Sequence, residues 1–270
     1  MTTATSRKAG REARAATGSK PQGTADEREA SRYVRDMFSR IAPRYDLLNH
    51  VLSLNLDKAW RRRAAERFRH ILARDGARVL DLCCGTGDLA LALEQRKSRE
   101  VRKRGNAGGA AIVGADFAHP MLVRANQKQP AGGPRIEYLE SDALLLPFPE
   151  GSFDLVTCAF GLRNLASYRG GLVEIRRVLR PGGEIGILEF AAPRIWPIAP
   201  LYRFYFTSIL PRVGGGVSGD RTAYSYLPDS VMRFPSPEQL AAHIADSGFA
   251  EARIERWSAG IVALYTAKGR

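Results

Sequence analysis

The chain has 270 residues, a formal net charge of +13 and 44% hydrophobic residues, which is enough apolar content for a globular core. No apolar run approaches the roughly 18–20 residues that a membrane-spanning helix needs. The basic residues are densest in residues 1–25 and 96–104, two segments predicted to be disordered or in a loop, so the charge is not evidence for a nucleic-acid partner and none is expected.

The cysteines and histidines indicate where the protein resides and what it does not bind. Cys83, Cys84 and Cys158 fall in apolar, strand-like runs, which is typical of core thiols in a reducing compartment. We therefore expect a cytoplasmic protein. The four histidines are scattered and no C-x-x-C or H-E-x-x-H pattern occurs, so no metal site is predicted.

The first quarter of the chain is predicted to consist of a tail and two helices. Residues 1–25 form the expected basic disordered tail. Apolar residues at helical spacing predict a helix over residues 26–45 that ends at Pro43, and a second helix over residues 57–74. Residues 26–76 as a whole are expected to cap a ligand pocket.

Residues 77–190 are predicted to be a cofactor-binding core in which strands and helices alternate. The expected strands are centred on residues 78–83, 111–116, 135–139, 153–159 and 184–190. Ser167 is a plausible N-cap for a helix over residues 168–179. The basic and then Gly/Ala-rich residues 96–110 are expected to form a surface loop.

The last third of the chain completes the sheet. Residues 191–235 are rich in aromatic residues and prolines, and we expect a lid over the substrate, with a helix that packs on the core as the alternative. Residues 236–270 begin with a capping box at Ser236 and end in two strands, 251–257 and 260–267, joined by a tight turn. The pattern predicts an α/β, Rossmann-like fold: a seven-stranded, mostly parallel sheet with one antiparallel edge strand.

The most informative segment is the turn after the first strand, Gly85-Thr86-Gly87, which leads into a helix. Glycines at this place let the backbone approach a nucleotide-like ligand. The spacing also satisfies a dinucleotide fingerprint, so NAD is an alternative. Asp81 and Asp88 add negative charge where a pyrophosphate would lie, and they favour S-adenosylmethionine, which carries an ammonium and a sulfonium. A turn without any ligand is the remaining interpretation.

Further candidate residues follow the other strands, because ligands of parallel sheets bind at the carboxyl ends of the strands. Asp116 ends the second strand, where a carboxylate can bind both ribose hydroxyls. Asp142 and Ala143 follow the third strand, and Asp142 could accept a hydrogen bond from the adenine amino group; an exposed loop aspartate is the alternative.

The pair Arg163-Asn164 follows the fourth strand and is the candidate substrate site. Arginine offers a fork of donors and asparagine offers both a donor and an acceptor, so the two could hold a hydroxylated ring and stabilise an anion on it. An Arg163–carboxylate bridge is the alternative. Tyr45, Asp46 and Glu189 are weaker candidates for positioning or base roles.

Several motifs in order give the chain a family resemblance. They are residues 37–49 (MFSRIAPRYDLLN), 160–164 (FGLRN), 177–183 (RVLRPGG), 188–190 (LEF) and 226–230 (YLPDS). In these motifs the chain resembles the C-methyltransferases of menaquinone and ubiquinone biosynthesis, and the resemblance covers nearly everything from Val34 to Lys268.

The resemblance implies a class I S-adenosylmethionine-dependent methyltransferase with cofactor contacts at Thr86, Asp116, Asp142 and Ala143, and with Arg163 and Asn164 near the substrate ring. Ala159 stands where family members often carry a serine contact, which puts that one contact in doubt. The implied substrate is a polyprenyl quinol, in the first place demethylmenaquinol and alternatively 2-polyprenyl-6-methoxy-1,4-benzoquinol. Such a substrate predicts peripheral contact with the inner face of the membrane. A homodimer is left open.

Three other functions remain at this stage: a different S-adenosylmethionine enzyme, an NAD-dependent oxidoreductase and a non-catalytic assembly subunit.

Overall fold

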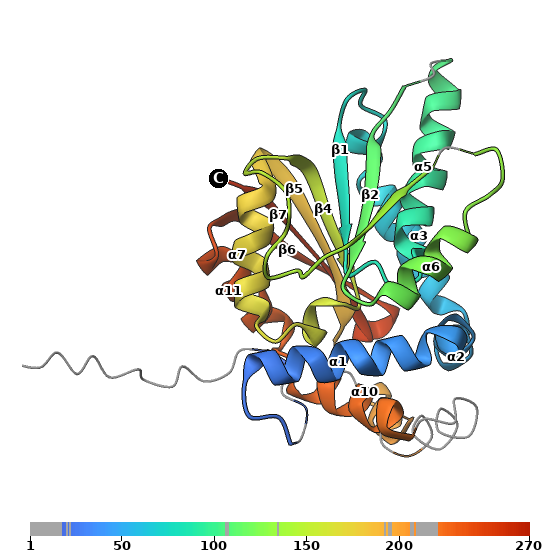
Figure 1. Cartoon of the computed structure of the whole chain (residues 1–270). Helices are drawn as coiled ribbons and strands as arrows, with labels where there is room; N and C mark the ends of the chain where they lie inside the picture. The colour runs from blue at the N-terminus through green and yellow to red at the C-terminus, as the bar shows by residue number, and fades with distance from the viewer. Residues whose placement is uncertain are drawn as a thin grey trace, which may run out of the picture.

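The structure is a computed structural model, and it describes residues 18–270 apart from residues 20, 22, 106–107, 134, 192, 194–195, 206–207 and 209–220. Helices cover both faces of a central sheet, and further helices lie across one end of it (Figure 1). No helix in the described part of the chain is long and apolar enough to cross a membrane.

The sheet has seven strands in the order β3-β2-β1-β4-β5-β7-β6. Their bounds are β1 Arg78–Leu82, β2 Ala111–Asp116, β3 Glu137–Glu140, β4 Phe153–Ala159, β5 Leu179–Phe190, β6 Phe249–Trp257 and β7 Val262–Gly269. The first five strands pair in parallel, and β7 runs antiparallel to both β5 and β6. The predicted fold is confirmed, and the single reversed strand is β7, which lies one place in from the edge formed by β6.

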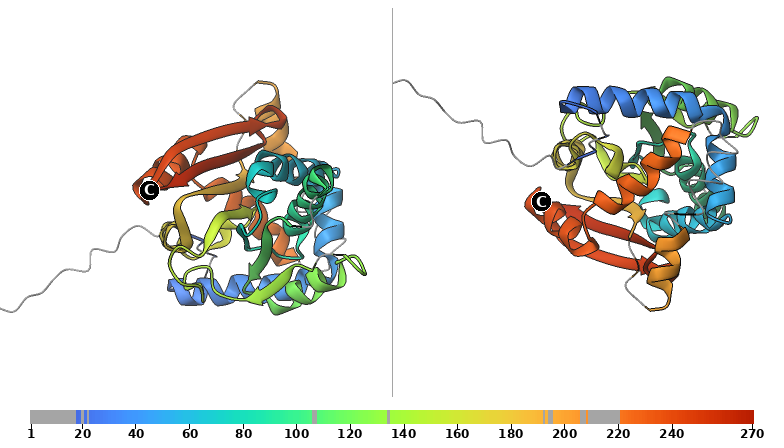
Figure 2. Two further views of the ribbon diagram at one scale, coloured as in Figure 1. Left: turned by 90° about the horizontal axis from the view of Figure 1, so that it is seen from above. Right: turned by 90° about the horizontal axis from the view of Figure 1, so that it is seen from below.

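The described helices are distributed over the two faces of the sheet and over the end where β1, β2, β4 and β5 finish. They are α1 Glu27–Ile41, α2 Tyr45–Leu52, α3 Leu56–Arg67, α4 Arg69–Leu72, α5 Asp88–Arg104, α6 His119–Gln127, α7 Tyr168–Val178, α8 Ile198–Phe204, α10 Arg221–Arg233 and α11 Pro237–Asp246. Seen from below the sheet, α1 and α10 lie across its end (Figure 2, right).

Two apolar layers hold the sheet and a third holds its cap. Leu172, Ile175 and Leu240 pack on one face, and Phe68, Leu89 and Leu93 pack on the other. The third cluster joins Met37 and Ile41 of α1 with Met121, Tyr202 and Val231. The N-terminal helices are therefore fixed over the end of the sheet by buried apolar surface.

Three predicted segments differ from the structure. The helix expected over residues 26–45 ends at Ile41, and a new helix, α2, starts at Tyr45; a short 3-10 turn, Ala42–Arg44, places Pro43 between them. The second expected helix is split into α3 and α4 at Phe68. In both places the chain bends so that its apolar residues stay on the core.

The basic surface loop predicted over residues 96–110 is wrong for its first part, because α5 continues to Arg104 and ends at Gly105 with φ +66. Ion pairs explain why the basic run is helical. Arg96 lies 2.8 Å from Glu66 and 2.7 Å from Glu100, and Lys97 lies 2.6 Å from Glu94. Residues 106–107 lie outside the described residues.

The aromatic segment, residues 191–235, contains α8 and α10. Tyr202 of α8 and Val231 of α10 pack on α1 and Met121 below the sheet, and residues 209–220 lie outside the described residues. The described part thus packs on the core beside the cap. The two helix starts predicted from capping residues are confirmed, at Ser167 and at Ser236.

Phe68 is the residue that ties the bend between α3 and α4 to the sheet. Its ring is fully buried, and a Cβ on Gly186 of β5 would lie 2.4 Å from it. We expect Gly186→Ala to lower the free energy of unfolding by about 1–3 kcal/mol through overpacking. Urea unfolding of Gly186→Ala, Phe68→Leu and the double variant measures it. The double variant should lose clearly less than the sum of the two single losses, and simple additivity would contradict this packing.

Candidate active site

A cleft of about 670 Å³ opens at the carboxyl ends of β1, β2 and β4, beneath α1 and α2. Six of the predicted site residues line it: Tyr45, Gly85, Asp116, Asp142, Ala143 and Asn164. A second hollow of about 310 Å³ adjoins it, since Tyr45 and Gly85 line both, and it contains Asp81 and Thr86. Elements that are far apart in the sequence therefore meet at one place.

The glycine turn has the left-handed backbone that its sequence predicts, with φ +55 at Gly85 and φ +81 at Gly87. Gly85 faces the cleft and its amide donates to Asp116 Oδ2 at 2.9 Å. Gly87 does not line either hollow. A Cβ there would lie 2.4 Å from the Tyr138 hydroxyl, so its role is close packing at the start of α5.

Asp116 lies at the end of β2, as expected, and lines the cleft. Its Oδ1 accepts from the amide of Ala118 at 2.9 Å. Burial raises the pKa of its carboxyl to about 6. Each carboxylate oxygen has one lone pair left for a ligand hydroxyl.

Asp142 and Ala143 also lie in the cleft wall. Asp142 Oδ1 accepts from the amide of Leu144 at 2.9 Å, and Ala143 is buried. Asp142 is exposed at the rim of the cleft, so the alternative of an exposed loop aspartate stays open beside a contact with the adenine amino group.

Asp81 is the most constrained acid of the site, with an exposed fraction of 1%. Thr157 Oγ1 donates to its Oδ1 at 2.9 Å, while its Oδ2 has no partner among the described residues. Burial raises the pKa of this carboxyl to about 7. A buried acceptor beside a hollow calls for a donor or a cation from a ligand. The residues of the two hollows thus fit a nucleoside with a positively charged end.

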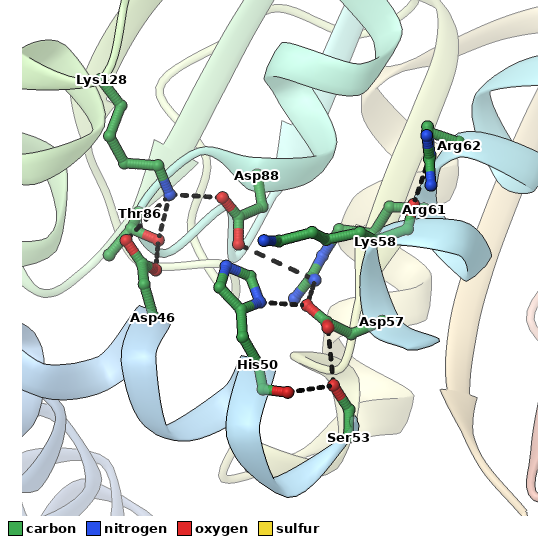
Figure 3. A network of polar contacts seen from close by, with 10 residues as sticks. All are labelled: Asp46, His50, Ser53, Asp57, Lys58, Arg61, Arg62, Thr86, Asp88 and Lys128. Atoms are coloured by element: carbon green, nitrogen blue, oxygen red, sulfur yellow. Dashed lines mark hydrogen bonds and ion pairs between the residues drawn. The ribbon is translucent and has the colours of Figure 1, made fainter. Parts of the chain in front are cut away.

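A network of charged residues surrounds the glycine turn (Figure 3). Thr86 Oγ1 donates to Asp46 Oδ1 of α2, and Lys128 Nζ lies 3.0 Å from Asp46 Oδ2 and 3.1 Å from Thr86 Oγ1. Lys128 Nζ also bonds Asp88 Oδ1. No sequence pattern pointed to Lys128, because its partners lie between 40 and 82 residues away.

This network corrects the argument made from Asp88. Its carboxylate is paired with Lys128, so it does not present the free negative charge that was expected to repel a pyrophosphate. The choice between S-adenosylmethionine and NAD must then rest on other observations.

Arg163 does not line the cleft, and the structure shows the carboxylate bridge that the sequence left as an alternative. Its Nη1 donates to Glu189 Oε2 at 2.8 Å and to the Phe160 carbonyl at 2.6 Å. Glu189, at the end of β5, is 0% exposed. Arg163 thus lies just behind the cleft wall and acts on it through its charge.

Asn164 does face the cleft, and its amide is held from both sides. Its Nδ2 donates to the Phe160 carbonyl at 3.2 Å, and its Oδ1 accepts from the Tyr226 hydroxyl of α10 at 3.2 Å. Ser19 Oγ lies 2.7 Å from the same hydroxyl, and the Ser19 amide donates to Leu165 at 2.7 Å. The expected tail boundary at residue 25 is thus too late, because Ser19 already packs against the site.

Tyr45, at the start of α2, closes the cleft from the cap side. Burial raises the pKa of its hydroxyl, and the charges of Arg61 and Arg163 oppose that rise. A second phenol bound in this cleft would be subject to the same two opposing effects.

Comparison with known proteins decides the family. The ubiE/COQ5 methyltransferase family matches residues 25–268. This chain belongs to that family. The Demethylmenaquinone methyltransferase of Thermus thermophilus is 49% identical over 229 residues, which cover 85% of this chain and 98% of that protein. The protein of the same name from Deinococcus radiodurans is 48% identical over 83% of this chain and 88% of its own length. A Ubiquinone/menaquinone biosynthesis C-methyltransferase UbiE of Geobacter sulfurreducens is 43% identical over 88% of this chain and 89% of its own length.

Solved structures agree with the fold. A SAM-dependent methyltransferase of Thermotoga maritima, titled a possible histamine N-methyltransferase, covers 87% of this chain and 99% of its own with a TM-score of 0.57 at 17% identity. One from Aquifex aeolicus covers 77% and 89% with a TM-score of 0.54, also at 17% identity.

The ubiE/COQ5 protein described here is therefore an S-adenosylmethionine-dependent methyltransferase, and its cofactor is S-adenosyl-L-methionine. The NAD-dependent oxidoreductase is set aside by the family match. The assignment of individual side chains to cofactor and substrate remains a prediction.

The buried acids generate a prediction about stability and pH. The folded pKa values of Asp81 and Asp116 are raised to about 7 and about 6, so the folded protein holds more protons than the unfolded chain above pH ~4. Stability of the ligand-free protein should fall as the pH rises through this range. Asp81→Asn should remove the part of this loss in the free energy of unfolding that is due to Asp81. That part is roughly 2–3 kcal/mol between pH 5 and pH 8, since one pKa unit is about 1.4 kcal/mol.

Urea unfolding of wild type and Asp81→Asn at several pH values measures this effect. Asp246→Asn, at the exposed end of α11, controls for the change in net charge. Parallel stability curves for wild type and Asp81→Asn would show that Asp81 is not the buried acid described here.

Proposed function

We propose that this methyltransferase transfers a methyl group to a ring carbon of demethylmenaquinol. The proposal is carried by the two relatives named Demethylmenaquinone methyltransferase, which are 49% and 48% identical and are covered over 98% and 88% of their length. The cleft supports it, because Asn164 and Tyr45 offer polar contacts for a hydroxylated ring between apolar walls of Phe38 and Met121. The alternative, 2-polyprenyl-6-methoxy-1,4-benzoquinol, is supported by the relatives whose name includes ubiquinone.

The cofactor, when bound, supplies a methyl group on a positively charged sulfur, which is an electrophile. The protein must then make the substrate ring nucleophilic. A quinol hydroxyl resembles that of tyrosine, with a pKa of roughly 10. Loss of its proton places negative charge on the neighbouring ring carbon, which is the atom that accepts the methyl group.

The charge of Arg163 would favour that proton loss. Burial raises the pKa of Tyr45, Tyr202 and Tyr226, and the charge of Arg163 opposes the rise at all three. A quinol hydroxyl next to Asn164 would be in the same field. In this proposal Asn164 touches the developing phenolate, Tyr45 covers the ring, and Arg163 acts from behind as a positioning residue held by Glu189.

Asn164→Ala tests this arrangement. We expect kcat/KM to fall about 100-fold, the usual loss when one donor to a developing oxyanion is removed, with the affinity for S-adenosylhomocysteine unchanged within about twofold. Tyr226→Phe, which removes the bond to Asn164 Oδ1 together with the one to Ser19 Oγ, should cost several-fold. Steady-state methylation rates and calorimetric titration give the two readouts. Full activity of Asn164→Ala would remove Asn164 from the mechanism.

The substrate itself is tested with purified protein, S-adenosylmethionine and short-chain quinols kept reduced by dithionite. Mass spectrometry should find methylated naphthoquinol, and a much slower reaction with the methoxybenzoquinol. Methylation of the benzoquinol alone would favour the alternative. If neither quinol is methylated while S-adenosylmethionine binds, the proposed substrate class is wrong.

We further propose that the protein works at the cytoplasmic face of the membrane, where a polyprenyl substrate resides. Exposed apolar side chains cluster where α2 turns into α3, and the exposed cations Lys58 and Arg62 follow on α3. These apolar residues are Leu47, Val51, Leu54 and Leu56, and Leu54 is 81% exposed. Trp196, at the start of the aromatic segment, is 82% exposed. Apolar side chains flanked by cations fit an anionic lipid surface.

Leu54→Asp should weaken sedimentation with phosphatidylglycerol vesicles several-fold, because it places a like charge against the lipid. Val173→Asp is the matched control, since Val173 is 59% exposed on α7, on a face of the sheet away from α2. Equal losses in the two variants would contradict a contact through the α2–α3 corner. Wild-type protein that stays in the supernatant at low salt would exclude the membrane contact.

A further inference from the structure

Arg61 of α3 is a buried cation inside the hollow that contains Asp81 and Thr86. Its exposed fraction is 7%, and its guanidinium carbon lies 5.5 Å from the centre of the Phe160 ring. Figure 3 shows the side chain beside Asp57 and Asp88. No part of the function proposed above uses this charge. A buried arginine needs acceptors for up to five N–H groups.

The acceptors present in the protein use one nitrogen only. Nη1 of Arg61 bonds Asp57 Oδ2 and lies 3.8 Å from Asp88 Oδ2. Within the described chain, every hydrogen bond and ion pair of Arg61 is made by Nη1, so Nη2 and Nε remain to donate to a ligand.

The two acids beside Arg61 have further polar partners. Asp57 accepts from Ser53 Oγ at 2.6 Å and lies 2.9 Å from His50 Nδ1. Asp88 is paired with Lys128. Asp57 forms the ion pair with Arg61 through Nη1, and the other donors of the guanidinium are left for a ligand. Asp57 thus fixes the side chain in place, and Arg61 itself lines the hollow.

The opposite charge in the same hollow is the carboxylate of Asp81, whose Oδ2 has no partner among the described residues. A hollow of about 310 Å³ with an unsatisfied carboxylate oxygen and a cation with spare donors is complementary to a zwitterion. An α-amino acid group carries those two charges on one carbon, and the methionine end of the cofactor is such a group.

We propose that Arg61 binds the carboxylate of the cofactor's methionine end while Asp81 receives its ammonium. The inference depends on the cofactor of the family and not on the substrate proposed above. It makes Arg61 the residue by which the protein distinguishes S-adenosylmethionine from a nucleoside that lacks the amino acid carboxylate.

Three ligands separate the contributions of the two charges. They are S-adenosylhomocysteine, its decarboxylated amine, and 5′-methylthioadenosine, which lacks both charged groups. Calorimetric titration of wild type, Arg61→Gln and Arg61→Lys gives their affinities. Arg62→Gln, the exposed neighbour on the same helix, is the matched control.

We expect Arg61→Gln to weaken S-adenosylhomocysteine about 10- to 100-fold, the usual range for a hydrogen bond to a charged group, and to leave the decarboxylated amine and methylthioadenosine within about threefold. Arg61→Lys should recover part of the loss, because it keeps the charge without the planar fork. Arg62→Gln should match wild type with all three ligands.

Other outcomes would overturn the inference. An equal loss of affinity for all three ligands in Arg61→Gln would mean that Arg61 only holds the network around Asp57. The same equal loss in Arg61→Lys would show that it does not come from a folding defect of the glutamine variant. Unchanged binding of S-adenosylhomocysteine would exclude a contact with the carboxylate. If wild type bound S-adenosylhomocysteine but methylated no quinol, the proposed substrate would fail and the role of Arg61 would stand.

Discussion

The site depends on burying carboxylates at the ends of parallel strands. Asp81, Asp116 and Glu189 end or nearly end β1, β2 and β5, and all three are almost completely shielded from solvent. Burying a charge costs several kcal/mol unless hydrogen bonds or ions compensate it. Asp116 is compensated by backbone amides and Glu189 by Arg163, so both carboxylates already have partners within the protein. Asp81 is left half satisfied, which makes it the place where a cationic ligand gains most.

The helix α2 connects this site to the cap. Tyr45 lines both hollows, and Asp46 bonds Thr86 of the glycine turn together with Lys128. Leu47 and Val51 of the same helix are exposed. One short helix thus contacts the cofactor turn on one side and presents apolar surface on the other. Any contact of that surface with lipid would act on the same element that closes the cofactor hollow.

Sequence patterns predicted the sheet well because the apolar runs of its buried strands and the acids at strand ends are local signals. The strands, the turn at Gly85 and the capping residues Ser167 and Ser236 were found in this way. The basic run from residue 96 was misjudged, since its helical conformation depends on Glu66 and Glu94 as partners. Lys128, Arg61 and Ser19 were missed for a related reason. Lys128 contacts Asp88, 40 residues away, Arg61 lies close to Asp88, 27 residues away, and Ser19 contacts Tyr226, 207 residues away; no local pattern records such contacts.

The placement of Arg163 changes how its importance should be understood. A bidentate grip on the substrate would require its guanidinium in the cleft, whereas its Nη1 is shared by Glu189 and the Phe160 carbonyl. The same carbonyl accepts from Asn164, so the pair orders the residue that does face the cleft. Removing Arg163 alone would leave Glu189 as an unpaired buried charge, typically a loss of about 3–5 kcal/mol of stability. An inactive Arg163→Ala variant is therefore no evidence that Arg163 takes part in the reaction. Substitution of Asn164 leaves no charge unpaired, so this is the residue at which the contact with the substrate is tested.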